Sequence, residues 1–381
     1  MRPLLVLFLV SLVCLPLAAQ TDRNQFIAEY GLLPPPVRTG GPDFQNLEGG
    51  RFDERNFSGY RYSRTLAAMR DAFRRRADAQ KSAVEVRAAI DRAYGVPAFL
   101  GDFSVVLREH ITASAAGTVD SIDFRFGPDG YGQALVGVPS HPNGRLLIAI
   151  HGCLINPDAV LTQMTSYGNS FGLRALEKGY TVIAPYVVSQ CDWIHNLDWI
   201  GQMSNTSVFG YEIAKIGQLT MWARQEYSLM QTAIWGISVG GQYSMLTAAR
   251  FPELFDVVVI SGATLDYEQN YTAAFDLVGV NQFDVLGANT QVALSALVRR
   301  RDVAVSILPK QMIFEMSTSD LSQGGIDFVS YVTAAANARG ATPPEVVLFQ
   351  GDHETNPAAT LAKINDAFLH VALPRQRAAA H

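Results

Sequence analysis

Four short runs of nearly continuous apolar residues constrain the fold of this chain more than any other feature of its sequence. Residues 145–150, 180–185, 232–235 and 256–261 lack the alternation that marks a half-exposed strand. Such runs are typical of strands buried on both faces, which occur in parallel sheets covered by helices. Segments with helical periodicity lie between the runs, so the sequence predicts a doubly wound α/β fold.

Further elements extend this pattern on both sides. Residues 121–126 and 133–138 alternate as the arms of a hairpin do, and strands are also expected at 311–316 and 345–349. Helices are expected at about 158–178, 209–228, 239–250, 324–338 and 357–371. The predicted architecture is a mostly parallel sheet with helices on both faces.

The N-terminal part is expected to lie outside this sheet. Residues 1–19 combine an early arginine, an apolar core too short to span a bilayer comfortably and a small-residue end, as a signal peptide does. Residues 20–117 are predicted to form an arm and a helical extension, with helical periodicity over 60–95. The catalytic domain would then be 118–372, followed by a tail at 373–381, in an exported, soluble protein.

The formal net charge of −5 gives no sign of binding to nucleic acid or to an anionic membrane. Residues 70–92 are rich in arginine but are interleaved with acidic residues, which favours a solvated helix face over a binding patch. No metal-ligand spacing and no glycine loop for phosphate or dinucleotide is present, so neither a metal nor a cofactor is expected.

One serine lies in the setting that nucleophilic catalysis requires. Ser238 stands between Gly236 and Gly240, directly after the apolar run 232–235 and before a segment that can form a helix. This order exposes a serine hydroxyl at a sharp turn, where a β-carbon on either glycine would collide with a neighbouring strand or helix. A second Gly-x-Ser-x-Gly match, around Ser170, follows no buried strand and is interpreted as a chance match at the start of, or within, a helix.

A base and an acid are expected on the loops beyond the last two strands. His353 follows the strand at 345–349, which favours it over the other histidines as the base. Asp320 follows the strand at 311–316, where its carboxylate would orient the imidazole. Glu315 lies inside that strand and is expected to point into the protein or to pair locally.

The first apolar run ends in His151 and Gly152, and the glycine lets the backbone turn sharply at the edge where such sheets bind ligands. The N–H groups of Cys153 (or Leu154) and Val239 are candidate donors of an oxyanion hole. His151 itself is expected to hold this loop by a hydrogen bond rather than to act as a base.

Together these residues resemble the α/β-hydrolase superfamily over about residues 118–372. The resemblance rests on His151-Gly152, on Ser238 with its flanking glycines, on Asp320 and on His353. It implies an α/β-hydrolase fold and a triad in the order serine, aspartate, histidine.

Two cysteines remain beyond the predicted signal peptide, Cys153 and Cys191. In the hydrolase fold the strands before them are neighbours that end at the same edge, so a disulfide is expected in an oxidising compartment. Cys191 opens a Cys-Asp-Trp segment that, with the earlier His-Gly-Cys segment, is faintly similar to secreted polyhydroxybutyrate depolymerases and feruloyl esterases.

An insertion at 263–310 separates two of the predicted strands. In this superfamily such an insertion looks like a lid, and a plain helical connection is an equal alternative. The aromatic residues that would line an apolar acyl pocket are Tyr267, Tyr271, Phe275 and Phe283, with Trp193 and Trp199 bordering the same cleft. The arginines at 299–301 are expected on a solvated helix face.

The favoured function is hydrolysis of small or polymeric carboxylic esters, with no stable membrane anchor. The second possible function is that of a peptidase of the prolyl-oligopeptidase type, which uses the same sharp serine turn (the nucleophile elbow) and the same triad. Such enzymes usually carry a large N-terminal β-propeller, which residues 20–117 are too few to form. A non-catalytic binding protein of the same fold is the third alternative, and the complete set of serine, aspartate, histidine and oxyanion glycine argues against it.

Overall fold

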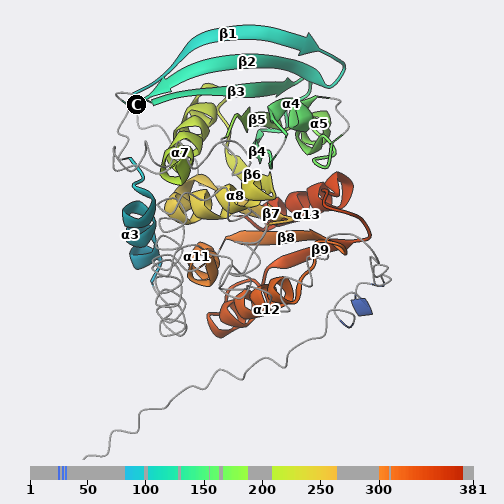
Figure 1. The fold of residues 1–381 in the computed structure, drawn as a ribbon. Helices are drawn as coiled ribbons and strands as arrows, with labels where there is room; N and C mark the ends of the chain where they lie inside the picture. The colour runs from blue at the N-terminus through green and yellow to red at the C-terminus, as the bar shows by residue number, and fades with distance from the viewer. Residues whose placement is uncertain are drawn as a thin grey trace, which may run out of the picture.

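A nine-stranded sheet runs through the molecule, with helices packed on both of its faces (Figure 1). The computed structural model describes residues 82–97, 102–127, 130–153, 155–162, 166–187, 208–263, 300–308 and 310–371, together with residues 25, 28, 29 and 31.

The strands form one mixed sheet. In sheet order they are β1 (Phe103–Ala113), β2 (Gly117–Phe126), β3 (Gly130–Pro139), β5 (Thr181–Pro185), β4 (Arg145–Ile150), β6 (Gln231–Ile237), β7 (Val257–Ser261), β8 (Gln311–Ser317) and β9 (Glu345–Phe349). The first four pair antiparallel, and the pairs from β5 through β9 are all parallel. The predicted mostly parallel α/β sheet is therefore confirmed.

The strand order reverses at β4, because the chain adds β5 on one side of it and β6 on the other. In open α/β sheets ligands bind beyond the carboxyl ends of the strands at such a switch point. The described helices are α3 (Ala83–Tyr94), α4 (Pro157–Leu161), α5 (Phe171–Glu177), α7 (Val208–Glu226), α8 (Val239–Arg250), α11 (Arg300–Ile307), α12 (Gln323–Ala338) and α13 (Pro357–His370), with a short 3-10 turn at Pro252–Leu254.

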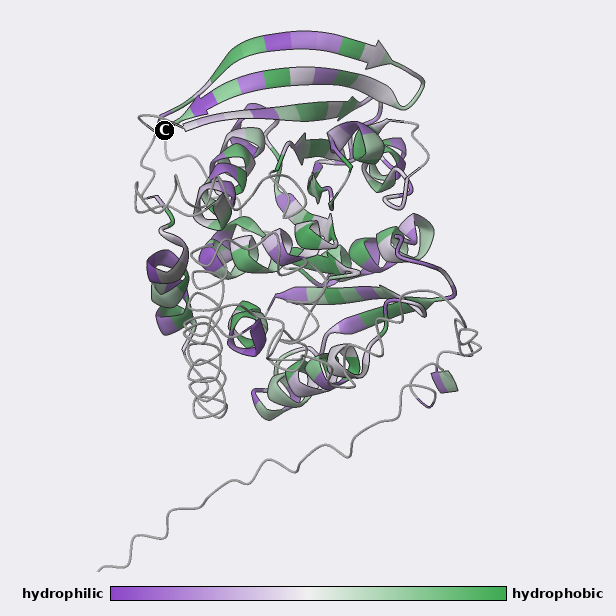
Figure 2. Ribbon diagram, viewed as in Figure 1, coloured by the Kyte–Doolittle hydropathy of each residue, from purple (hydrophilic) through white to green (hydrophobic). Residues whose placement is uncertain are grey.

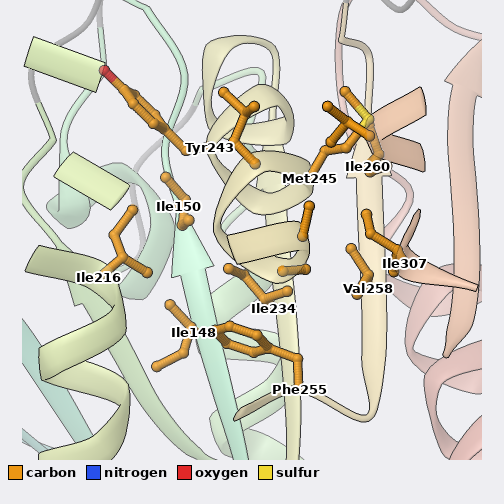
Figure 3. Close-up of a cluster of buried hydrophobic side chains, with 14 of the residues drawn as sticks. Ile148, Ile150, Ile216, Ile234, Tyr243, Met245, Phe255, Val258, Ile260 and Ile307 are labelled. Atoms are coloured by element: carbon orange, nitrogen blue, oxygen red, sulfur yellow. The ribbon is translucent and has the colours of Figure 1, made fainter. Parts of the chain in front are cut away.

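Both faces of the central strands are buried, which is the reason for their continuous apolar sequences. Ile148 and Ile150 of β4 face the cluster that includes side chains of α3, α7, α8, α11 and α12, whereas Leu147 and Ala149 face the cluster with α4, α5 and α13. Figure 3 shows the first cluster, where Ile234 of β6 lies among these isoleucines. Each fully buried side chain of this size contributes about 1.5–3 kcal/mol to folding.

The predicted hairpin is present as β2 and β3, which pair in register along their whole length. The single helix predicted at 158–178 is instead two helices, α4 and α5. Among the described residues between them, Asn169 and Ser170 have a φ of 49° each, which is incompatible with a continuous right-handed helix. Ser170 is the N-cap of α5, as expected for a residue at the start of a helix.

The sheet begins with β1, inside the segment 20–117 for which the sequence predicts an arm and a helix. This strand was missed because it is an edge strand with little burial: Val106 and Leu107 are 51% and 48% exposed. Figure 2 shows hydrophilic residues along β1 and β2, whereas the central strands are mostly hydrophobic. Without a buried face there is no apolar periodicity to recognise.

Among the helices that the structure describes, none combines the length and the apolar character needed to cross a membrane. The predicted signal peptide and the tail at 373–381 lie outside the described residues, as does most of the predicted lid-like insertion.

Candidate active site

Ser238 lies in the turn between β6 and α8, in a strained backbone conformation. Its φ of 59° and ψ of −123° place it in a region that non-glycine residues rarely adopt, at a cost of about 1–3 kcal/mol. The Ser238 N–H donates to the carbonyl oxygen of Ser261 at 2.8 Å, and its carbonyl accepts from the N–H of Gly241 at 3.0 Å. The strain is thus held by bonds on both sides, and it leaves the serine half-buried at the carboxyl end of β6.

The two flanking glycines leave no room for a side chain. A β-carbon on Gly236 would overlap the backbone of Gly240 in α8 and lie 2.7 Å from Oγ of Ser244. A β-carbon on Gly240 would overlap the carbonyl oxygen of Ile150 and lie 2.5 Å from that of His151. Close packing of helix on strand is therefore the physical reason for glycine at both positions.

Asp320 and His353 are hydrogen-bonded to each other. Nδ1 of His353 lies 2.7 Å from Oδ2 of Asp320, and both side chains are partly exposed. Burial alone would lower the pKa of His353. The hydrogen bond to Asp320 and its negative charge outweigh that effect, so the pKa is raised above its ordinary value of 6.5. Because Nδ1 donates to the carboxylate, the neutral imidazole keeps its lone pair on Nε2.

One residue links this pair to the serine. Gly262 follows Ser261, which accepts the Ser238 N–H. A β-carbon on Gly262 would lie 3.0 Å from Oδ2 of Asp320 and 3.3 Å from Nδ1 of His353. Ser238 and the Asp320–His353 pair thus pack against two consecutive residues at the end of β7.

His151 orients the peptide group between Gly152 and Cys153. Its Nδ1 donates to the carbonyl oxygen of Gly152 at 2.9 Å, and its Nε2 accepts from the N–H of Val187 at 3.1 Å. Both ring nitrogens are occupied, so His151 is neutral and is not available as a base. Because a peptide is planar and trans, holding the Gly152 carbonyl also sets the opposite direction of the Cys153 N–H.

Val239 is the first residue of α8, so its N–H is among those without an acceptor inside the helix. The N-terminus of a 12-residue helix is also the positive end of its dipole. Both described candidates for the oxyanion hole lie next to a residue at this site: Val239 follows Ser238, and Cys153 follows Gly152, where a β-carbon would lie 2.9 Å from Cβ of Ser238. The other candidate, Leu154, lies outside the described residues.

Tyr167 belongs to this site and was missed by the sequence analysis. Its ring lies 5.1 Å from that of His353, and its hydroxyl donates to the carbonyl oxygen of Cys153. A β-carbon on Gly152 would overlap the Tyr167 hydroxyl and lie 2.9 Å from Cβ of Ser238. The one signal in the sequence was its position directly before the second Gly-x-Ser-x-Gly match.

Glu315 is fully buried and accepts several hydrogen bonds. Its Oε1 accepts from the N–H of Asn356 at 2.7 Å and from Oγ1 of Thr360 at 2.6 Å, and its Oε2 accepts from the hydroxyl of Ser261. Burial raises the pKa of Glu315 even though these hydrogen bonds oppose the shift. As expected, the side chain pairs inside the protein, and it joins β7 to the start of α13.

Replacing Glu315 with glutamine is expected to lower stability more than turnover. The amide would turn an NH₂ group toward hydrogen-bond donors, at a cost of about 1–3 kcal/mol in free energy of unfolding. Glu345→Gln is the control, because that exposed residue pairs with Lys363 at 2.9 Å on the surface and should cost less than about 1 kcal/mol. Chemical denaturation and kcat measured on both variants check this, and a loss confined to kcat would contradict it.

The predicted disulfide between Cys153 and Cys191 is wrong for this structure, because Cys153 is a free cysteine. The strands β4 and β5 are indeed neighbours, as the prediction assumed. Adjacency of strands, however, sets positions only near the strand ends. Cys191 lies six residues beyond the end of β5, outside the described residues.

The interpretation of the arginines at 299–301 as a solvated helix face is also wrong for Arg300. This residue is 7% exposed, and its guanidinium donates to the hydroxyl of Tyr94 at 3.1 Å and to Oε1 of Gln242 at 3.3 Å. Arg301 lies 5.0 Å from the ring centre of Tyr331. Arg300 and Arg301 pack α11 against its neighbours, since a long side chain can bury its stem and still pair its charge. Arg299 lies outside the described residues.

The predicted pocket residues lie outside the described part of the chain. These are Trp193, Trp199, Tyr267, Tyr271, Phe275 and Phe283. Among the described residues, no group of three or more histidine, cysteine or acidic side chains is placed to hold a metal ion.

Comparison with solved structures shows which proteins share this fold. An acetyl xylan esterase from Paenibacillus sp. R4 is 13% identical with a TM-score of 0.53, covering 80% of this chain and 99% of its own. A Bacteroides fragilis protein described as a candidate acetyl xylan esterase is 14% identical with a TM-score of 0.53, covering 76% of its own chain and 72% of this one. A promiscuous CE15 esterase from a marine bacterial metagenome is 11% identical with a TM-score of 0.50, covering 76% of this chain and 91% of its own.

At the level of sequence, no family model and no curated protein matches this chain. The similarity is therefore one of fold. The chain has the α/β-hydrolase fold, which it shares with these esterases.

Proposed function

We propose that this protein is a serine hydrolase that cleaves carboxylic esters, with Ser238 as nucleophile, His353 as base and Asp320 as the orienting acid. One observation carries the proposal. The strained Ser238 is bonded through its N–H to Ser261, and the next residue, Gly262, packs against the Asp320–His353 pair. A strained serine backbone and a histidine paired with a carboxylate at the same edge of a sheet are typical of active sites, because packing of the fold alone requires neither.

The reaction follows from the protonation states at the site. Nε2 of His353 takes the proton of the Ser238 hydroxyl as its oxygen attacks the ester carbonyl. The tetrahedral intermediate collapses, and the imidazolium gives the proton to the leaving alcohol. Water then attacks the acyl-enzyme, with His353 again as base, and releases the carboxylic acid and free Ser238.

The negative charge on the substrate oxygen is stabilised by the N–H groups of Cys153 and Val239. Each such donor is worth about 3 kcal/mol in the transition state when it is held in place beforehand. The first donor is held by the hydrogen bond from His151 to the Gly152 carbonyl and by the one that His151 accepts from the Val187 N–H, and the N-terminal turn of α8 holds the second.

We further propose that residues 1–19 direct export and are removed. We also propose that the aromatic part of the insertion at 263–310, which precedes the buried helix α11, covers the site as a lid with an apolar lining. The composition of both segments supports these roles. Mass analysis of the mature N-terminus tests the first, because an intact Met1 would contradict it. Deletion of the aromatic part of the insertion tests the second, because unchanged chain-length preference would contradict it.

Matched substrates decide between an esterase and a peptidase. Aryl esters of graded acyl length and peptide nitroanilides are compared by kcat/KM under one set of conditions. Higher values are expected for the esters, and for uncharged apolar acyl groups among them. Faster cleavage of the amides than of matched esters would replace the esterase assignment by a peptidase of the same triad.

A further inference from the structure

Two loops that are far apart in sequence are bound together over the candidate site. The N–H of Thr355 donates to the carbonyl oxygen of Tyr167 at 3.0 Å, and its hydroxyl donates to that of Gly168 at 2.8 Å. Nδ2 of Asn169 donates to the carbonyl oxygen of Thr355 at 2.7 Å. Thr355 takes part in all three bonds and lies two residues after His353. The segment Tyr167–Asn169 therefore restrains the loop that carries the histidine.

The segment is itself held in an unfavourable conformation. Asn169 and Ser170 have left-handed backbone angles in succession, with a φ of 49° each, and neither is glycine. Each such residue costs about 1–3 kcal/mol, and such strain persists only where the surrounding contacts enforce it. The three bonds between this segment and Thr355 are contacts of this kind.

Tyr167 contacts both halves of the catalytic apparatus proposed above. Its ring lies 5.1 Å from the ring of His353, at an interplanar angle of 35°. Its hydroxyl donates to the carbonyl oxygen of Cys153, on the loop of the proposed oxyanion donor. One side chain therefore restrains the base and the oxyanion loop at the same time.

We propose, on the basis of the hydrolase function above, that Tyr167 is a positioning residue that couples the oxyanion loop at Cys153 to the catalytic base His353. The hydroxyl fixes the loop and the ring fixes the imidazole. Two substitutions distinguish the roles of the hydroxyl and the ring of Tyr167, because phenylalanine keeps the ring and loses the hydroxyl, whereas leucine loses both.

The two variants are expected to differ in kind. Tyr167→Phe should lower kcat about tenfold with little change in KM, which is less than the 10²–10³ lost when an oxyanion donor itself is removed. The pH at which kcat/KM rises should stay unchanged.

Tyr167→Leu should lower kcat further and move the rise of kcat/KM to higher pH. Burial lowers the pKa of His353, so that pKa should increase when the ring that covers the imidazole is lost. The other charged groups at these loops are Asp320, bonded to His353, Glu354, bonded to Asn169 at 3.2 Å, and the exposed Asp352, which directly precedes His353.

Tyr180→Phe is the matched control. That tyrosine hydroxyl donates to Oδ1 of Asn365 at 2.7 Å, and Tyr180 lies directly before β5, at the opposite end of that strand from the active-site edge. The control should lose stability with kcat and the pH profile unchanged. All variants are assayed well below their measured unfolding temperatures.

The outcomes separate this inference from the proposed function. If wild-type protein reacts with a fluorophosphonate and the Tyr167 variants lose stability with no change in kcat or in the pH profile, the tyrosine is structural only and the inference is overturned. If wild-type protein neither hydrolyses esters nor reacts with the probe, the proposed function fails and this role fails with it. A tenfold loss of kcat in Tyr167→Phe, with the pH shift confined to Tyr167→Leu, establishes the role.

Discussion

Replacing Ser238 with alanine is expected to abolish ester hydrolysis and covalent labelling by a fluorophosphonate. No other atom can form the acyl-enzyme, and loss of a catalytic serine typically lowers kcat by about 10⁶-fold. The fold should survive, because the bonds of Ser238 to Ser261 and Gly241 are made by its backbone. Labelling followed by mass spectrometry, with a thermal melt of the same sample, checks both statements.

The chain supplies a matched control in its second Gly-x-Ser-x-Gly segment. Ser170 is the N-cap of α5, and the described residues before it, 166–169, form turns and no strand, so it does not lie at a strand-to-helix turn. Ser170→Ala should therefore keep covalent labelling. Persistent labelling of Ser238→Ala, or loss of labelling in Ser170→Ala alone, would show that the nucleophile has been assigned to the wrong serine.

Replacing Asp320 with asparagine is expected to lower kcat by about 10⁴-fold while the fold is retained. The carboxylate lies 2.7 Å from Nδ1 of His353, and it both orients the ring and stabilises the imidazolium. An asparagine keeps the size but not the charge, and its amide can favour the wrong tautomer. Steady-state kinetics beside Glu315→Gln test the assignment of the acid. If Glu315→Gln causes the larger loss of turnover, the two carboxylates have been assigned the wrong way round.

The same substitution should move the pH dependence in a defined direction. His353 acts as a base only when neutral, so kcat/KM rises with pH through its pKa, which lies above 6.5 in the native protein. Removing the charge of Asp320 removes the cause that raises this pKa, so the rise moves to lower pH as the plateau falls. A rise that stays in place would mean that another group controls the activity.

The raised pKa also has a consequence for stability. A histidine whose pKa is higher in the folded state stabilises the fold fully at pH values below its unfolded pKa of about 6.5. That contribution disappears as the pH increases through the raised pKa. Asp320→Asn should therefore lower the free energy of unfolding more at a pH below 6.5 than at a pH above the raised pKa of His353. The effect is modest because His353 is partly exposed.

The sequence determined most of the fold and the elbow because both depend on local rules. A strand buried on two faces must be continuously apolar, as in β4 and β6, and a serine at a sharp strand-to-helix turn needs glycine on both sides. Asp320 and His353 were predicted in the same way, because each lies on the loop after a recognisable strand. The edge strand β1 escaped the same rules, since it has no buried face to impose a pattern.

What only the tertiary structure decided are the contacts between segments that are remote in sequence. The rings of Tyr167 and His353 are in contact although 186 positions separate them in the sequence. Glu315 accepts a hydrogen bond from Ser261, which is 54 positions away. Arg300 is buried because Tyr94 and Gln242 happen to face it, and Cys153 is free because strand adjacency does not fix a residue several positions beyond a strand end. Local propensity and periodicity describe how a residue relates to its near neighbours. The partners of a loop residue depend on how the whole sheet brings the loops together, and a single sequence contains no periodic signal for that.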